Sequence, residues 1–312
     1  MCFFLKWPAY QKISFSIIGK TDSSLFFEGG PVNLTFTKLS SMDETHELYL
    51  CQVSETVSCG ACCGLYNLPD LSREKLEFLL SKRTEDFESV PRTENEIFEF
   101  QRRNEAPHRL CRPFPQFHHC PFLGLIGAEK RRVGCLLHPA VPGNNGVDYR
   151  SMSWYGEKAC RTYFCPTTKK LPAVYKSILI QAIDNWYDFG LIVTEHSLVT
   201  AYFKELESRL GRRIRVSDYT QNLMATNALK EFTKLKSNWP YRRHDAPGPC
   251  NFFFENGLYL RPPVFRATPD IRLSPYEKIL TELDSGFTTL KEIEEADQLL
   301  DDLFFQAQRA VM

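Results

Sequence analysis

Residues 59–64 read Cys-Gly-Ala-Cys-Cys-Gly, and this stretch decides how the middle of the chain is organised. A Cys-x-x-Cys turn lets two sulfur atoms converge on one metal ion, and the glycines beside it let backbone N–H groups approach the thiolates. Adjacent Cys62 and Cys63 cannot easily both reach one small ion from an extended chain. The stretch therefore predicts a metal centre in which either the metal is a larger cluster or one of the two neighbours has a second role.

Two more cysteine groups follow the first. Cys120 begins the sequence Cys-Pro-Phe-Leu-Gly, and Cys135 comes later, directly after a glycine. The third group, Cys160-Arg-Thr-Tyr-Phe-Cys165-Pro, again places proline after a cysteine, as is common among iron–sulfur ligands. Chance rarely concentrates cysteine beside glycine and proline in this way. We therefore expect ligands scattered between Cys59 and Cys165 to build a metal centre.

The cysteine content favours a reducing compartment. The chain has 312 residues and 11 cysteines, an odd number in a chain far longer than the small secreted scaffolds that depend on disulfides. Its first residues lack the basic region and the long apolar run of a signal peptide, and no window is apolar enough for a membrane span. We expect a cytoplasmic protein with no membrane partner, in which clustered cysteines bind metal.

Charge is balanced overall but not along the chain. Lys+Arg and Asp+Glu both number 38, whereas residues 101–170 hold 12 basic and 4 acidic side chains. This basic segment either packs against the acidic segments on both sides of it or surrounds something anionic, such as a metal held by four thiolates or a phosphate-bearing ligand. A second basic region, residues 209–215 and 242–244, is interpreted as a solvated helix end, so nucleic acid is not expected as a partner.

Four phrases occur in a fixed order: Cys-Gly-Ala-Cys-Cys, His-Cys-Pro-Phe-Leu-Gly, Gly-Cys-Leu-Leu-His-Pro and Cys-Arg-Thr-Tyr-Phe-Cys-Pro. In this order they resemble the YkgJ-like cysteine-cluster family of zinc- or iron-chelating domains, over roughly residues 50–170. That family includes bacterial flagellin lysine N-methylases, thought to work through an iron–sulfur centre. The segment from Ala140 to Lys158 departs from the family, which has a short Arg-Pro link there. The resemblance implies a ligand pool of seven cysteines: Cys59, Cys62, Cys63, Cys120, Cys135, Cys160 and Cys165.

Both zinc and a [4Fe–4S] cluster fit such a pool, since each needs four thiolates and seven are present. His118, His119 and His138 lie next to these cysteines, where hydrogen bonding to the ligands is the better expectation than direct coordination. A redox-active dithiol in the first group is a further alternative, although the strand–helix context of thioredoxin is missing. The isolated cysteines are expected to be buried small hydrophobic residues: Cys2, Cys111 and Cys250.

Other kinds of chemistry leave no motif. The chain lacks a phosphate-binding Gly-x-x-x-x-Gly-Lys-Ser/Thr loop, a dinucleotide fingerprint, a Gly-x-Ser-x-Gly elbow and the Cys-x-x-x-Cys-x-x-Cys triplet of radical S-adenosylmethionine enzymes. One interpretation is a metal-dependent protein-modifying enzyme such as a lysine N-methylase. It would act on a protein substrate and take S-adenosylmethionine as cofactor, although no motif for this cofactor is present. The alternative is a non-catalytic zinc-binding module with a structural or interaction role.

The apolar pattern predicts a mainly α-helical fold with a coil-rich cysteine segment and a small β-hairpin. Residues 109–172 show no helical period, as expected where a metal organises the chain, and Asn256-Gly257 between two apolar runs predicts the hairpin. Helices are expected over residues 70–82, 172–190, 195–210, 218–236 and 289–310, and capping boxes at Thr93 and Ser274 begin two more. We expect an irregular N-terminal extension (1–41), a cysteine-cluster metal-binding domain (42–171), a helical region (172–238) and a hairpin followed by C-terminal helices (239–312).

Overall fold

A computed structural model describes residues 48–105, 112–246, 248–250, 259 and 261–312. Residues Glu47–Met312 group together as one unit. The predicted extension 1–41, the predicted Asn256-Gly257 hairpin and the isolated Cys2 and Cys111 lie outside the described residues.

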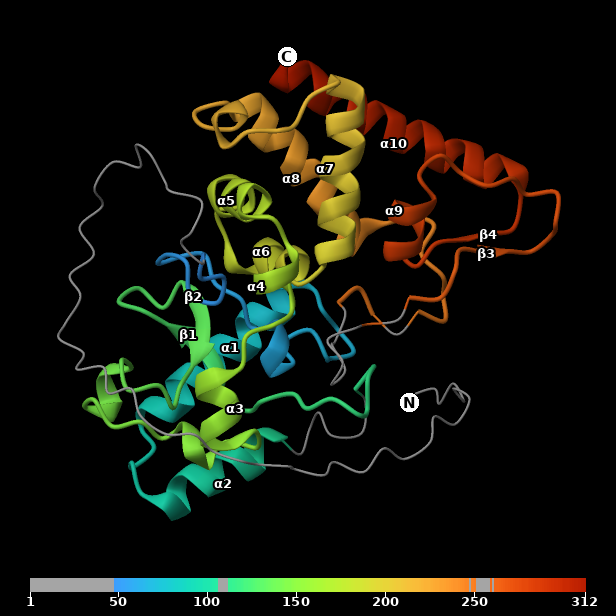
Figure 1. Cartoon of the computed structure of the whole chain (residues 1–312). Coiled ribbons are helices and arrows are strands. Elements are labelled where there is room, and N and C mark those ends of the chain that lie inside the picture. The colour runs from blue at the N-terminus through green and yellow to red at the C-terminus, as the bar shows by residue number, and fades with distance from the viewer. Residues whose placement is uncertain (1–47, 106–111, 247, 251–258, 260) are drawn as a thin grey trace, which may run out of the picture. The chain divides into compact units, whose positions relative to one another are not determined.

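The described chain is mainly helical, as the sequence predicts (Figure 1). Its α-helices are α1 (Arg73–Glu88), α2 (Glu94–Glu105), α3 (Gly156–Thr162), α4 (Thr167–Lys170), α5 (Ala173–Ala182), α6 (Trp186–Val193), α7 (His196–Leu210), α8 (Leu223–Asn238), α9 (Glu277–Glu282) and α10 (Leu290–Val311). Short 3₁₀ helices are η1 (Ala61–Cys63), η3 (Pro142–Asn144), η4 (Arg150–Met152) and η5 (Val216–Asp218). Strand β1 (Leu123–Ile126) pairs antiparallel with β2 (Arg132–Cys135), and β3 (Phe265–Arg266) pairs in parallel with β4 (Gly286–Phe287).

The segment before α5 is more regular than the sequence predicts. Residues 109–172 contain the β1–β2 pair as well as α3 and α4, each too short to show a hydrophobic period in the sequence. The antiparallel pair therefore lies in the cysteine segment. Gly124 pairs with Gly134 in it, and both positions are crowded: a Cβ on Gly124 would approach Leu136, and one on Gly134 would approach Ile126.

The helix expected over residues 172–190 is two helices. Ile183 is extended, and Asn185 starts α6 by accepting a hydrogen bond from the amide of Asp188. Gly190 does not end a helix as predicted but lies inside α6, where a Cβ would come within 2.2 Å of the Tyr66 hydroxyl. The apolar residues on both sides of this break keep the same spacing of four residues. The hydrophobic period of the sequence therefore does not show that the helix is interrupted.

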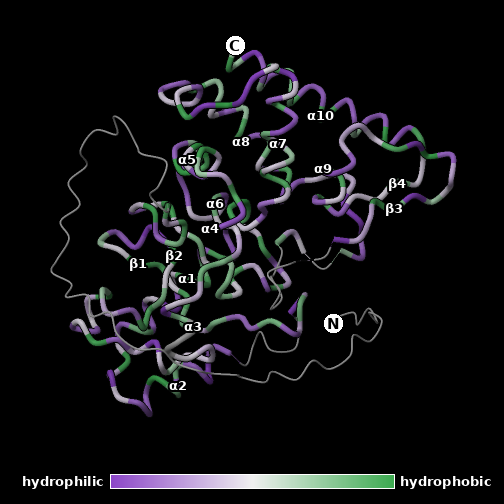
Figure 2. The backbone as a smooth tube through the Cα atoms, viewed as in Figure 1, coloured by the Kyte–Doolittle hydropathy of each residue, from purple (hydrophilic) through white to green (hydrophobic). Residues whose placement is uncertain are grey.

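The C-terminal helices start and stop where polar residues satisfy their ends. Helix α7 ends at Gly211, which is left-handed with φ of 65°, as predicted. Helix α8 begins later than predicted, because Asn222 caps it by accepting from the amide of Ala225. Helix α10 begins with the capping box of Thr289 and Glu292. It packs against α7 and α8 (Figure 1), and polar and apolar residues alternate along it (Figure 2).

Two hydrophobic cores share the described residues. One is built by α5 to α10, and it also takes in Leu50 and Val57 from the start of the described chain. The other is built by η1, α1, α2 and the β1–β2 pair, with rings of Phe87, Phe100 and Phe122 in contact. Helix α6 contributes to both cores, so the cysteine segment and the C-terminal helices are joined through packed side chains.

A group of buried charges lies among the C-terminal elements. Glu195 and Lys236 are fully buried, with Lys236 Nζ 3.1 Å from Glu195 Oε2. Arg261, also buried, pairs with both Glu195 and Asp284. Glu282 lies beside this group, and its burial raises its pKa from 4.5 to about 7. Over the residues that the structure describes, no helix is both long enough and apolar enough to cross a membrane.

Candidate metal centre

Cys51 and Cys59 face each other across a tight turn. Gln52 and Ser58 form an antiparallel bridge, and the amide of Cys59 donates to the carbonyl of Cys51 at 2.9 Å. Residues directly opposite each other in such a pair point to the same face, with Cβ atoms about 5 Å apart. Cys51 is therefore a neighbour of the first predicted ligand, although the sequence analysis did not include it.

Gly64 brings the first cysteine group against the second. It ends η1 in the left-handed region, with φ of 79°, and a Cβ there would lie 2.0 Å from the carbonyl oxygen of His118. Only glycine accommodates both the angle and the approach. The close approach lets the amide of Cys120 donate to the carbonyl of Cys63 at 2.9 Å. Two cysteines far apart in the chain are thereby joined at the backbone.

The β1–β2 pair and η4 complete the neighbourhood of Cys120. The Leu123 amide bonds the carbonyl of Cys120, and Leu123 is the partner of Cys135 across the sheet. Cys160 lies on α3, which packs against η4, and its Sγ is 3.0 Å from the hydroxyl of Ser153. Cys135 and Cys160 are close enough for their charges to interact.

Cys165 returns the chain to the first group. The ring of the preceding Phe164 meets the ring of Tyr49 edge-on at a centroid distance of 6.0 Å. Tyr49 lies two residues before Cys51, so Cys165 is brought towards the Cys51–Cys59 turn. A thiolate at Cys165 would interact with one at Cys62. Cys62 is exposed to solvent, and so are the rings of Tyr49, Tyr163 and Phe164 near it.

Hydrogen-bond donors surround the sulfur atoms. The Ala61 amide donates to Cys59 Sγ at 3.5 Å. Against burial, which is the largest effect, the amides of Phe122 and Leu137 act to lower the pKa of Cys120 and Cys135, and Thr167 and Thr168 act in the same way on Cys165. These bonds favour the thiolate form, because a negatively charged sulfur is the stronger acceptor. Such donors are typical of sulfur atoms that bind metal.

Burial works against the thiolate form. It raises the pKa of the Cys51 and Cys135 thiols to about 12, and it also raises the pKa of Cys120 and Cys165. Cys62 is different: a hydrogen bond from the thiol of Cys63 lowers its pKa. Donors near the sulfur atoms favour thiolates, whereas burial disfavours thiolates that carry a free charge. Both effects fit sulfur atoms whose negative charge is neutralised by a metal.

Arg83 supplies a positive charge from inside the core. Its side chain is fully buried on α1, and its Nη1 lies 2.9 Å from His119 Nε2 and 3.3 Å from the carbonyl of Cys120. Within the described part of the chain, no carboxylate lies at ion-pair distance from Arg83 and its Nε has no hydrogen-bond partner. Burial lowers the pKa of Arg83 to about 10, while a thiolate at Cys120 acts to raise it.

A second guanidinium group lies beside Cys135 and Cys160. Arg150 pairs with Asp148 at 2.7 Å, and its charge interacts with Cys135 and Cys160. Arg161, the residue after Cys160, pairs with the same Asp148 at 2.9 Å. Of the basic segment 101–170, Arg150 thus lies beside cysteines, whereas Arg83 comes from outside that segment.

The histidines beside the cysteines have different surroundings. His119 Nε2 must accept from Arg83, so its Nδ1 carries the proton and donates to the Gly64 carbonyl at 2.7 Å. His138 Nδ1 accepts from the amide of Ala140. His118 stacks on Trp154, and its buried Nε2 has no hydrogen-bond partner among the described residues. His119 thus orients other groups, and His118 keeps a buried nitrogen without a hydrogen-bond partner among the described residues.

The seven predicted cysteines are all described, and the structure gathers them with Cys51 into one region. The nine described cysteines form no disulfide among themselves, and Cys250 is buried as expected. As they are placed, no three His, Cys, Asp or Glu side chains in the described part of the chain have the geometry to hold a metal ion. Cys51 was not predicted, because the turn and the bridge of Gln52 with Ser58 that bring it to Cys59 leave no pattern of residue types.

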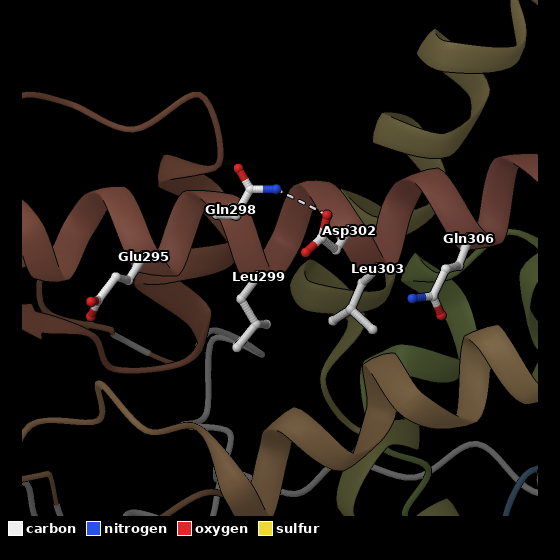
Figure 3. A pocket seen from close by; sticks show the side chains of 6 residues that line it. All are labelled: Glu295, Gln298, Leu299, Asp302, Leu303 and Gln306. Atoms are coloured by element: carbon white, nitrogen blue, oxygen red, sulfur yellow. Dashed lines mark hydrogen bonds between the residues drawn. The ribbon is translucent and has the colours of Figure 1, made fainter.

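One surface hollow, formed by residues of the segment 79–104, is lined in part by Arg83 but by no cysteine. The hollow shown in Figure 3 lies along α10, and its lining consists of side chains from that helix alone. Gln298 and Asp302 bond to each other there at 2.9 Å. A single helix face brings no converging chemistry, so the candidate site remains the cysteine region.

A comparison of the chain with protein-family models, with curated proteins and with solved structures finds no match.

Proposed function

We propose that this chain is a metal–thiolate protein, in which cysteines of residues 51–165 hold an iron–sulfur cluster or zinc. The observation that supports this best is the set of donors aimed at the sulfur atoms of Cys59, Cys120, Cys135 and Cys165. A buried thiol that stays neutral gains little from such donors, whereas a metal-bound thiolate gains a great deal.

Arg83 supports the same proposal from the side of the positive charge. Burying an unpaired charge costs several kcal/mol in the interior of a protein, on the order of 3–5 kcal/mol for a broken ion pair. A metal held by four thiolates carries net negative charge, for zinc and for a [4Fe–4S] cluster alike. The metal centre would give the guanidinium group beside Cys120 its counter-charge.

The metal would supply either electron transfer and Lewis acidity or a structural anchor. The residues of this chain provide the thiolates, orient them through backbone amides and shield most of them from water. Cys62 is the exception, because it is exposed next to exposed aromatic rings. An open thiolate beside aromatic side chains favours a reactive site. We therefore place the metal-dependent protein-modifying enzyme, such as the lysine N-methylase that the family resemblance implies, ahead of the closed structural zinc module.

Anaerobic purification of the full chain, followed by a visible absorption spectrum and elemental analysis, tests the metal. A brown protein with broad absorption near ~400 nm and about four irons per cluster indicates iron–sulfur, and a colourless protein with zinc indicates the other metal. The matched control is Cys250→Ser, since Cys250 is a buried cysteine outside the gathered region. A chain that retains neither metal contradicts the proposal.

Methyl transfer to protein lysines tests the activity separately. With S-adenosylmethionine and a lysine-rich protein, the enzyme interpretation predicts lysine methylation that Cys62→Ser reduces at least tenfold while the helical circular dichroism is kept. A metal-loaded chain without methyl transfer leaves the metal–thiolate proposal standing and favours the structural module.

A further inference from the structure

We propose that the gathered cysteines form two four-thiolate metal sites rather than one, with the division between Cys62 and Cys63. The inference rests on the proposed metal–thiolate function and extends it. The first site consists of Cys51, Cys59, Cys62 and Cys165. The second site consists of Cys63, Cys120, Cys135 and Cys160.

The local conformation separates the neighbouring pair. Cys62 and Cys63 lie in η1, a 3₁₀ helix, in which successive side chains point about 120° apart because a turn takes three residues. Cys62 is exposed, whereas Cys63 packs against the core of η1, α1 and the β1–β2 pair. The two thiols still lie close enough for a hydrogen bond, so the two sites would adjoin at this pair while its members have different surroundings.

Backbone contacts assemble the first site. Cys51 and Cys59 are opposite each other in the antiparallel bridge, so their side chains share a face. Cys62 follows Cys59 with the Cys-x-x-Cys spacing. Cys165 is held nearby through the contact of the adjacent Phe164 with Tyr49, two residues from Cys51.

Different backbone contacts assemble the second site. The amide of Cys120 donates to the carbonyl of Cys63, and the β1–β2 register places Cys135 opposite Leu123, three residues after Cys120. The amide of Tyr149 donates to the carbonyl of Leu137 at 3.1 Å, which brings η4 and the α3 residue Cys160 against the end of β2.

The electrostatic neighbours of the thiols divide in the same way. Within the first set, Cys51 and Cys59 each face Cys62 and Cys165. Within the second set, Cys63 faces Cys120 and Cys135, which in turn face Cys160. Arg83 and Arg150 lie beside the second set, and exposed tyrosines lie beside the first. Contact between the sets runs mainly through the adjacent pair Cys62 and Cys63.

The number of thiolates agrees with two sites. A tetrahedral zinc ion and a [4Fe–4S] cluster each take four thiolates, and eight cysteines fill two such sites with none left over. This also explains why two adjacent cysteines occur at all, since each serves its own metal. The buried second site, with two arginines, suits a structural or electron-storing role, and the exposed first site suits the reactive one.

Metal stoichiometry in the full chain tests the division. We expect about two zinc ions, or about eight irons, per wild-type chain, twice what a single site holds. The double variants Cys51→Ser/Cys165→Ser and Cys120→Ser/Cys135→Ser should each retain half of the metal, and Cys250→Ser should retain all of it. Circular dichroism checks that each variant is folded.

A second measurement needs no variant. Titration of the metal-free wild-type chain with Co²⁺ produces thiolate-to-cobalt absorption, which should saturate at about two equivalents for two four-thiolate sites. Saturation at one equivalent, or complete loss of metal in both double variants, overturns the division while leaving a single metal site in place. A wild-type chain that binds no metal at all overturns the proposed function as well.

Discussion

Gly64 is the residue at which the first two cysteine groups meet. Its positive φ and the nearby carbonyl of His118 both exclude a side chain. We expect Gly64→Ala to lower the free energy of unfolding by about 1–3 kcal/mol from the backbone angle, with a further loss from the clash. Gly146→Ala is the matched control, because Gly146 has φ of 80° and no atom within 4 Å of the added Cβ. Equal losses in urea unfolding of the two variants would contradict the close approach.

Arg83 provides a test of charge at the same scale. Arg83→Met removes the buried guanidinium group beside Cys120 without a large change of volume. We expect metal affinity to fall about 10- to 100-fold, as is usual when a group that supports metal ligands is removed. Arg73→Met, on the exposed side of α1 where Arg73 pairs with Glu77, should leave the affinity unchanged. Competition with a chelator measures both, and unchanged affinity in Arg83→Met would argue against its role as counter-charge.

The sequence selected some residues of the candidate site and missed others. Cysteine, glycine and proline in fixed order selected seven residues that the structure brings into one region. Cys51 was missed because its relation to Cys59 depends on a turn and a backbone bridge, which leave no pattern of residue types. Arg83 was missed because a basic residue on a helix is ordinarily solvated, and only packing shows that this one is buried.

At the scale of elements, α10 is defined by its cap. The Thr289 hydroxyl oxygen accepts from the amide of Glu292 at 3.2 Å. The carboxylate of Glu292 in turn accepts from the amide of Thr289. We expect Thr289→Ala to destabilise the protein by about 1 kcal/mol. Ser72→Ala at the start of α1 is the control, because Ser72 occupies the cap position without a side-chain hydrogen bond. Thermal unfolding of both variants gives the comparison, and a loss in Ser72→Ala as large as in Thr289→Ala would show that the cap hydrogen bond is not the cause.

End signals predicted some elements well and others not: the helix expected from the Ser274 capping box begins only at Glu277, with Tyr276 at its cap position. Gly211 and the Thr289 capping box fix α7 and α10, and both helices end or begin where the sequence indicates. The 172–190 helix was wrong because the break at Ile183 keeps the apolar spacing intact. The β1–β2 pair was not predicted, since each strand has four residues and their pairing depends on two crowded glycines.

At the scale of the whole molecule, the buried ion pair of Glu195 and Lys236 links the start of α7 to the end of α8. Glu195→Ala leaves Lys236 and Arg261 without this carboxylate, so we expect a loss of about 3–5 kcal/mol. In the double variant with Lys236→Met, the loss should be smaller than the sum of the single losses. Asp86→Ala, which breaks an exposed pair with Lys82, should change stability by about 0–1 kcal/mol. Additive losses in urea unfolding would contradict direct coupling of the buried charges.

Glu282 makes the same region sensitive to pH. Burial, reinforced by the charge of Glu195, raises its folded-state pKa from 4.5 to about 7. The folded state then holds a proton that the unfolded state has lost, so stability is greatest below about pH 4.5 and falls as the pH rises to about 7. We expect Glu282→Gln to remove about 1–3 kcal/mol of this fall. The free energy of unfolding of the wild type should fall between pH 5 and pH 7.5, and that of the variant should change less. An equal change in both proteins would count against the raised pKa.

The bridge that carries Cys51 and Cys59 also has a consequence for the order in which the protein is made. All eight gathered cysteines leave the ribosome before α5 does, so every thiol is outside the ribosome before the C-terminal helices are complete. Leu50 and Val57, however, pack into the core that α5 to α10 build. The turn bearing Cys51 and Cys59 therefore gains its final support last, and on the proposed function these two thiols would be open to a metal before the helices cover the residues around them.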